Sequence, residues 1–145
     1  CISEALRGLG LAYYVRGLTS TAQEKFVECI EYSTRMGLER TAIQIRHMTA
    51  WYEILSMRPE AALEVGRQTC IAGARIPDRR TIMNGGRMQC YSLLEQGRWT
   101  EAEALLNENL RLSGWRGDRR NGGFLHHDVG IGAADTECAD ACDPR

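Results

Sequence analysis

Long apolar segments are missing from this chain of 145 residues, and so is a sizeable net charge. The longest apolar runs are a few residues, whereas a helix needs roughly 20 apolar residues to cross a bilayer, so we expect no membrane anchor. The 18 basic and 19 acidic residues leave a net charge of -1, which argues against general attraction to nucleic acid or to an anionic membrane. We therefore expect neither among the direct partners.

Targeting features are absent as well. The chain begins with Cys1 rather than Met and has no basic segment followed by an apolar core and a cleavage site. We therefore interpret it as an internal or truncated fragment of a cytoplasmic protein. Lysine is nearly absent, since Lys25 is the only one among 18 basic residues, and this preference for Arg indicates GC-rich coding DNA rather than a function.

Three of the six cysteines, Cys29, Cys70 and Cys90, lie in segments with helical periodicity. A small apolar side chain fits such positions, and free Cys is among the residues most often buried in proteins. We therefore expect these three thiols to pack in the core.

The segment 116–145 is rich in glycine and lacks an apolar stripe, so we expect an irregular tail or an out-of-frame remnant. It contains His126, His127, Cys138 and Cys142, whose spacing matches none of the standard zinc patterns. A small metal-binding protein or enzyme that uses these four residues is therefore the weaker alternative. We expect no metal, no cofactor and no catalytic residue in the chain.

The sequence is similar to itself when it is shifted by 40 residues, which indicates a repeat. Small residues recur where two helices would approach, and turn residues recur between helices, although Met57 stands where Gly is expected. Gly66 stands where the other two segments have a large apolar residue, which predicts a thin spot, that is, a place where the core is poorly filled. The aligned sets are Gly10/Ala50/Cys90, Tyr14/Ile54/Leu94, Gly17/Met57/Gly97, Ala22/Ala62/Ala102, Phe26/Gly66/Leu106 and Ile30/Cys70/Leu110.

Apolar periodicity with Gly or Pro connections predicts helices and no strand. A single helix pair cannot bury both of its apolar stripes, so successive pairs must stack. We expect an all-α fold over residues 1–115, a right-handed superhelical stack of about three antiparallel helix pairs, which is a TPR-like α-solenoid. The pairs are 1–37, 38–77 and 78–115. The predicted helices lie near 2–16, 20–36, 40–57, 60–75, 78–96 and 100–113.

Local signals agree with these boundaries. One of residues 19–21 is expected to cap the second helix and Asp78 the fifth, while Thr100 and Glu103 have the spacing of a capping box. Pro59 is expected to open the fourth helix. The predicted core consists of Leu6, Leu9, Tyr14, Phe26, Ile30, Ile43, Met48, Ile54, Leu63, Met83, Leu94, Leu106 and Leu110. One member of each aromatic pair, Tyr13-Tyr14 and Trp51-Tyr52, is expected to be exposed.

The stretch QGRWTEAEALLNENL, Gln96 to Leu110, resembles the turn and second helix of a tetratricopeptide repeat. Gly97, Trp99, Ala102 and Leu106 stand at the motif positions, which makes Trp99 a packing residue between the paired helices. The loops MGLERTA and IPDRRTI resemble those of the longer helical repeats in bacterial MalT/LuxR-type ATP-dependent transcription regulators and in related cyclase-type regulators.

This resemblance implies a non-catalytic scaffold for protein interaction or effector sensing, and the chain has no phosphate-loop motif of its own. A fragment of a MalT/LuxR-type regulator is the first interpretation, and the repeat region of an adenylate or guanylate cyclase-type signalling protein is the alternative. The oligomeric state and the output domain do not follow from the sequence.

The partner is expected on the concave face, which the first helices of successive pairs line. It is a protein or peptide, or a small effector. The Arg79-Arg80 and Arg119-Arg120 doublets fall in repeat loops and need no nucleic acid to explain them. The expected partner-binding residues are Tyr13, Arg46, Glu53, Arg87 and Gln89, because Arg and Tyr often dominate binding energy.

Overall fold

The computed structural model describes residues 2–113, and every regular element within that range is a helix. The all-α class is therefore confirmed for this part of the chain. The predicted tail, 116–145, and its boundary at residue 115 lie outside the described residues. The helices are α1 (Ile2–Val15), α2 (Thr19–Arg35), α3 (Glu39–Ile45), α4 (His47–Leu55), α5 (Pro59–Arg75), α6 (Arg79–Glu95) and α7 (Trp99–Ser113).

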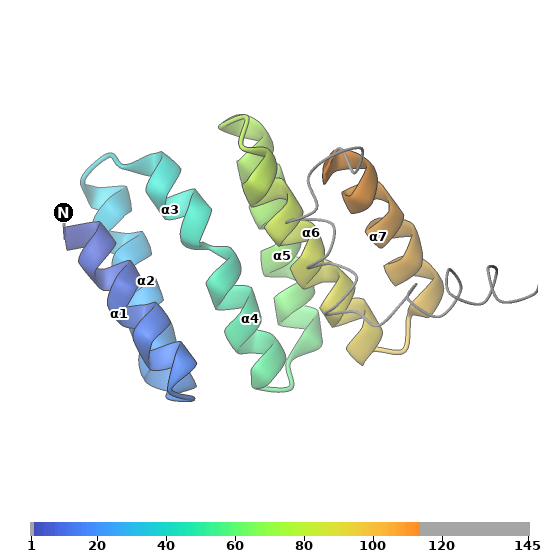
Figure 1. Ribbon diagram of the computed structural model, residues 1–145, viewed down its shortest axis with the longest axis horizontal. Coiled ribbons are helices and arrows are strands. Elements are labelled where there is room, and N and C mark those ends of the chain that lie inside the picture. The colour runs from blue at the N-terminus through green and yellow to red at the C-terminus, as the bar shows by residue number, and fades with distance from the viewer. Residues whose placement is uncertain (1, 114–145) are drawn as a thin grey trace, which may run out of the picture.

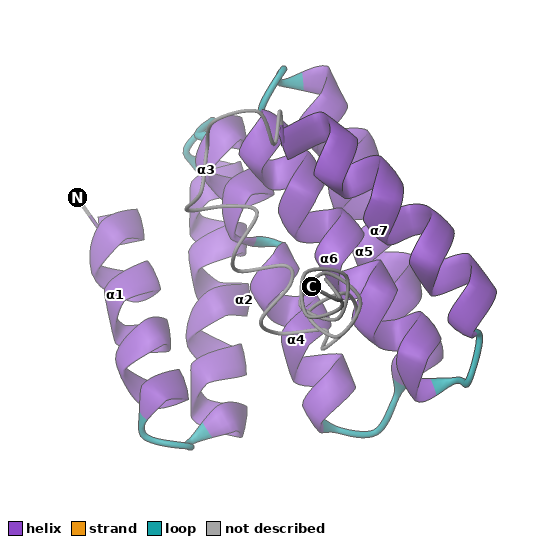
Figure 2. Cartoon of the chain, turned by 45° about the vertical axis from the view of Figure 1, so that its right-hand side comes forward, coloured by secondary structure: helices purple, strands orange, loops and turns teal. Residues whose placement is uncertain are grey.

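The helices follow one another across the molecule in chain order, as Figure 1 shows from α1 at one side to α7 at the other. Each packs chiefly against its sequence neighbours: α1 on α2, α4 on α5, α5 on α6, and α6 on α7. Contacts of α2 with α3 and α4 join the first part of the chain to the second, and contacts of α6 with α4 and α5 join the second part to the third. Short loops connect the helices, as Figure 2 shows from another side.

The predicted helix 40–57 is wrong in one respect, because it is broken at Arg46 into α3 and α4. The Thr49 hydroxyl and the Thr49 N–H both bind the Arg46 carbonyl, at 2.8 and 3.0 Å, and the His47 ring binds the Gln44 carbonyl at 3.0 Å. These bonds over three residues replace the regular four-residue ladder and bend a helix. The two halves accordingly point in different directions in Figure 1.

Of the predicted caps, Asp78 is confirmed, since its carboxylate accepts from the N–H groups of Arg80 and Thr81 at the start of α6. Pro59 opens α5 as predicted. The other two predictions are wrong. Helix α2 begins at Thr19, after Leu18, which makes no side-chain cap, and α7 begins at Trp99, which places Thr100 inside the helix.

The aligned small residues pack as the repeat predicts. Gly10, Ala50 and Cys90 are buried, and so are Ala22, Ala62 and Ala102. At Gly10 the Phe26 ring occupies the space of the missing side chain, since an added Cβ would lie 2.5 Å from it. Two clusters form the core: Leu6, Ala22, Phe26, Cys29 and Ile45, and Met83, Cys90 and Leu106.

The thin spot predicted at Gly66 is absent. Helices α5 and α6 instead approach until their backbones touch, because a Cβ on Gly66 would lie 2.9 Å from the Gly85 carbonyl oxygen. A Cβ on Gly85 would lie 2.7 Å from the Gly66 carbonyl oxygen. Two glycines facing each other thus replace a large side chain by direct backbone packing.

The thiols behave as core groups. Cys29 and Cys90 are fully buried and Cys70 is half-buried. Each donates to a backbone carbonyl, Cys29 to Ser3, Cys70 to Ile82 and Cys90 to Ala102. Burial raises the pKa of all three, that of Cys90 to about 11, so they are neutral thiols near pH 7.

Some predicted packing positions are wrong. Leu9 is 47% exposed, because α1 buries Ser3, Leu6 and Gly10 rather than the stripe that contains Leu9. Trp99 is 63% exposed at the first residue of α7, so it does not pack between the paired helices. The pairs Tyr13-Tyr14 and Trp51-Tyr52 are half-buried at all four positions, against the expectation that one of each is exposed.

The turns between paired helices share one conformation. Gly17 and Gly97 have φ of 76° and 70°, the left-handed region that glycine adopts without a steric penalty. Met57, at the equivalent position, has a φ of 57° as well. A residue with a side chain therefore has the same left-handed backbone as the two glycines, which strains the second turn.

We expect Met57→Gly to raise the free energy of unfolding by roughly 1 kcal/mol, because relief of left-handed strain exceeds the added chain entropy of glycine. The Met57 side chain is largely exposed, so little packing is lost. Gly17→Ala is the matched reverse change, since no atom lies within 4 Å of the added Cβ and only the backbone is strained. Urea denaturation measures both, and stabilities that move in the same direction would contradict the explanation.

Candidate functional site

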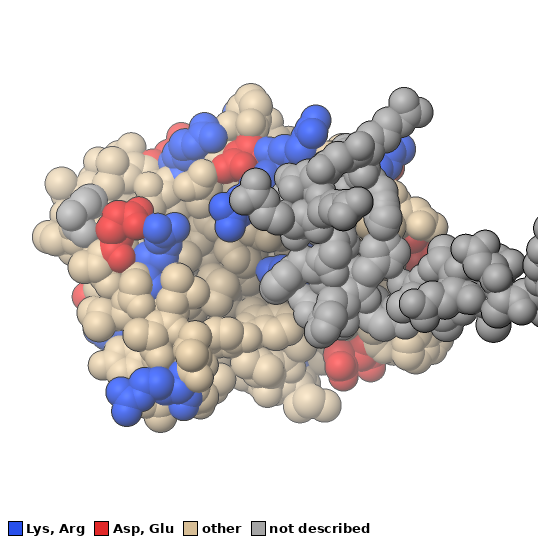
Figure 3. Space-filling model, in the orientation of Figure 1, with Lys and Arg blue, Asp and Glu red and all other residues tan. Residues whose placement is uncertain are grey.

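A hollow of about 450 Å³ lies between α1, α3, α4 and α6. This size falls within the usual range for small-molecule sites. On the face seen in Figure 3, basic and acidic side chains lie side by side over the upper part, next to uncharged surface. The hollow is lined by Glu4, Arg7, Leu11, Thr41, Gln44, Ile45, His47, Met48, Asp78, Arg80, Thr81, Met83, Asn84 and Arg87.

Many of these residues are equivalent under the shift of 40. Glu4, Gln44 and Asn84 form one set and Arg7, His47 and Arg87 another, each with one member from α1, from α3 or α4, and from α6. Four residues after His47 and Arg87, Trp51 of α4 lies against Tyr91 of α6, with ring centroids 5.1 Å apart. Residues that lie 40 positions apart in the chain thus line the same hollow.

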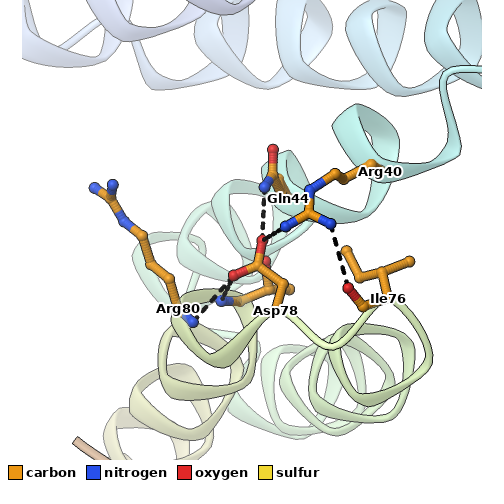
Figure 4. Close-up of polar contacts among 6 residues, drawn as sticks. Arg40, Gln44, Ile76, Asp78 and Arg80 are labelled. Atoms are coloured by element: carbon orange, nitrogen blue, oxygen red, sulfur yellow. Dashed lines mark hydrogen bonds and ion pairs between the residues drawn. The ribbon is translucent and has the colours of Figure 1, made fainter.

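Asp78 connects two of the helices that line the hollow, α3 and α6. Its carboxylate accepts from the Gln44 amide at 2.6 Å, caps α6, and lies 3.8 Å from the Arg40 guanidinium (Figure 4). Arg40 also donates to the Ile76 carbonyl. These bonds tie α3 to the start of α6, and the Gln44 hydrogen bond is the main reason why the pKa of Asp78 lies below its usual value.

The remaining charges of the hollow come from α1 and α6. Glu4 and Arg7 form an ion pair at 2.5 Å on α1. On α6, Arg80, Asn84 and Arg87 follow at helical spacing and share one face. The Arg80 side chain points away from the Asp78 carboxylate in Figure 4 and forms no ion pair within residues 2–113.

His47, the first residue of α4, lines the hollow. Withdrawal from water is the main reason why its pKa is lowered to about 4, and the positive charges of Arg87 and Arg80 contribute to the same shift. Its Nδ1 lies 3.0 Å from the Gln44 carbonyl oxygen, so this nitrogen carries the hydrogen and Nε2 keeps a lone pair. The ring is therefore neutral near pH 7.

An aromatic row borders this polar surface. The Trp51 indole donates to the Tyr14 hydroxyl and packs edge-on against both Tyr14 and Tyr91. One ring comes from α1, one from α4 and one from α6. Because the rings hold one another, they fix the spacing of three helices beside the hollow.

Of the five expected partner-binding residues, only Arg87 lines the hollow. Arg46 is half-buried at the break between α3 and α4, and Tyr13 packs against the first core cluster. Glu53 forms an ion pair with Arg58 at 2.8 Å, next to the Tyr52 ring that Arg58 covers. The structure therefore does not bring the five together, and their role in binding stays a prediction.

Gln89 lies outside the hollow. It lies in the interface between α5 and α6, where its amide donates to the Cys70 sulfur at 3.2 Å and its stem lies over Gly66. Gln89 is half-buried there, and its role in partner binding stays a prediction.

Three residues of the hollow, Arg7, His47 and Arg80, are absent from the expected partner-binding set. The sequence nevertheless contains features that point to them. Helical periodicity alone makes His47 an ordinary helix-face residue and Arg80 part of a loop doublet. The shift of 40 aligns Arg7 with His47 and Arg87, and the Asp78 cap fixes the phase of α6 so that Arg80 falls on the face of Arg87.

Within residues 2–113, no group of three or more His, Cys, Asp or Glu side chains could hold a metal ion. His126, His127, Cys138 and Cys142 lie outside the described residues, so the metal alternative stays a prediction. None of the described helices is both long and apolar enough to cross a bilayer. Comparisons of the chain with known protein families, with characterised proteins and with solved structures give no significant match.

Proposed function

We propose that this chain is a non-catalytic helical-repeat scaffold, a TPR-like α-solenoid of about three helix pairs, whose inner face binds a protein segment, a peptide or a small effector. The observation that carries the proposal is the hollow lined by equivalent positions of successive units, Arg7, His47 and Arg87 above all. In helical-repeat proteins, equivalent residues of successive units lie on one face of the stack and form an extended binding surface.

Packing supports the repeat part of the proposal. The small residues of the aligned sets are buried at each helix contact, and the left-handed turn recurs at Gly17, Met57 and Gly97. Contacts run mainly between sequence neighbours, which is how solenoid units depend on one another.

The parent protein that we propose is a MalT/LuxR-type transcription regulator, with the repeat region of a cyclase-type signalling protein as the alternative. The support is the resemblance of Gln96–Leu110 to the repeat motif, weakened by the exposure of Trp99. The coding sequence around this segment tests it: a phosphate-loop ATPase upstream and a helix-turn-helix downstream support the first, and a cyclase domain the second.

Selection from a peptide library and a small-molecule library against the full chain tests the binding function. We expect Arg87→Glu to weaken selected binders by about tenfold, because the change reverses a charge in the hollow. Arg79→Glu is the matched control, since this exposed residue lies on the same helix outside the hollow, and thermal melts check that both variants fold. Binders that bind both variants as tightly as the wild-type chain would remove the concave face from the proposal.

A further inference from the structure

One side of α1 is apolar and exposed. Ile2, Ala5, Leu9 and Ala12 follow one another at intervals of three or four residues, which places them along one side of the helix. Ile2 is 56% exposed and Leu9 is 47% exposed, and both alanines are exposed as well. None of the four has a polar side chain, although the solvent side of a helix usually consists of polar residues. We call this set the outer face of α1.

The other two sides of α1 already have contacts. Ser3, Leu6 and Gly10 are buried on the side that meets α2, and Arg7 and Leu11 line the hollow. Helix α1 lies at one end of the row of helices in Figure 1, and among the described helices it packs chiefly on α2. The outer face is the side of α1 that remains.

The shift of 40 residues assigns a counterpart to each residue of the outer face. The counterparts are Ala42, Ile45, Thr49 and Tyr52 on α3 and α4, and Ile82, Gly85, Gln89 and Ser92 on α6. None of these counterparts is exposed, since each is either buried or half-buried. The same positions are therefore covered in the second and third helix pairs and uncovered in the first.

The helix that covers the counterparts is, in both cases, the second helix of the preceding pair. Ile45 of α3 belongs to the same core cluster as Phe26 of α2. On α6, Gly85 meets the backbone of α5 at Gly66. This side of the first helix is thus the interface between pairs at both places where two described pairs meet.

We propose that the outer face of α1 binds the second helix of a further helix pair, which precedes α1 in the same polypeptide. The proposal rests on the repeat scaffold proposed above and names a partner of its first helix. Burial of Ile2 and Leu9 would withdraw the exposed apolar surface of α1 from water, as burial of Ile45 does in α3.

The connections between the pairs favour a helix from the same chain. Only the three residues 36–38 separate α2 from α3, and only 76–78 separate α5 from α6, so each covering helix stands directly before the helix that it covers. A separate protein fits less well, because a stable interface usually takes about 20–30 residues from each partner, far more than the outer face offers.

Ala5 determines the kind of helix that fits. At this position α6 has Gly85, which lets α5 approach until the two backbones touch, and α3 has Ile45, which packs in a cluster with Phe26. Alanine is intermediate in size. We therefore expect an amphipathic helix that presents small and medium apolar side chains to α1 and polar side chains to solvent.

A chain that is extended before Cys1 by a copy of residues 41–80 tests the inference. The copy has the length of one period, so it places a second α5 and its loop before α1 as α5 stands before α6. We expect the extended chain to melt about 5 °C above the wild-type chain, because one more interface between pairs adds to the stability of a repeat protein. A second version with Ala5→Gly has the residue of α6 at this position and removes any steric conflict with the copied α5.

The variant Leu9→Glu separates contact from mere extension. In the wild-type chain it should change the melting temperature by less than about 2 °C, because Leu9 is already exposed, whereas in the extended chain it should lower it by about 5 °C. Val15→Glu is the matched control on the same helix. Val15 is 82% exposed and its counterparts Leu55 and Glu95 are exposed too, so this change should have equal effects in both chains.

Several results would overturn the inference. Equal effects of Leu9→Glu in the wild-type and extended chains, or added residues that stay unfolded in both extended versions, would show that the outer face does not accept this helix. A wild-type chain that dimerises in sedimentation experiments, and loses the dimer with Leu9→Glu, would assign the face to a second copy. Binders that still respond to Arg87→Glu in any of these cases would leave the proposed function of the hollow intact.

Discussion

Gly85→Ala is expected to lower the free energy of unfolding by roughly 2–3 kcal/mol, as overpacking of a tight interface does. The added Cβ would lie 2.7 Å from the Gly66 carbonyl oxygen and 2.9 Å from the Cys70 backbone nitrogen. Both are backbone atoms of α5, so they cannot rotate away and the two helices must separate. Urea denaturation at neutral pH measures the loss.

Gly8→Ala is the control for this change, because Gly8 also lies inside a helix but no atom lies within 4 Å of its added Cβ. We expect it to raise the free energy of unfolding by roughly 0.5–1 kcal/mol, since Ala is the better helix former. Opposite signs for the two variants would show that helix packing, and not helix propensity, decides the effect at Gly85. A stabilising Gly85→Ala would mean that α5 and α6 do not touch through their backbones.

The wild-type chain is expected to lose about 2 kcal/mol more stability than His47→Asn when the pH falls from about 7.5 to about 5. The pKa of His47 is about 4 in the folded chain, below its usual value of 6.5. Between these values the unfolded chain binds one more proton than the folded chain. The contribution is therefore complete above pH 6.5 and is lost as the pH falls toward 4.

Asn is the suitable replacement, because its amide nitrogen takes the position of Nδ1 and can still donate to the Gln44 carbonyl. His126 and His127 are present in both chains, so their titration cancels in the difference. Asp78 titrates below this pH range, since its pKa is lowered. Chemical denaturation at both pH values gives the result, and equal losses in the two chains would show that the ring is not withdrawn from water.

The helical class, most helix boundaries and the spacing of 40 residues follow from the amino-acid sequence alone. Apolar periodicity places helices with few ambiguities, because burial of one face dominates the energy of a short helix in a protein. The aligned small residues predicted the helix contacts, and Asp78 predicted the start of α6. Each of these features depends on residues close together in the chain or on a regular period.

Which side chains meet depends on tertiary packing. The break at Arg46 rests on hydrogen bonds of His47 and Thr49 that a pattern of apolar residues does not reveal. The place of Gln89 depends on how closely Gly66 and Gly85 let two helices approach.

The phase of each helix against its neighbours sets whether a charged residue faces the hollow, an interface or solvent, because one residue turns a side chain by roughly 100°. Sequence periodicity predicted helices with one buried face, whereas tertiary packing decided that Arg7, His47, Arg80 and Arg87 line one hollow.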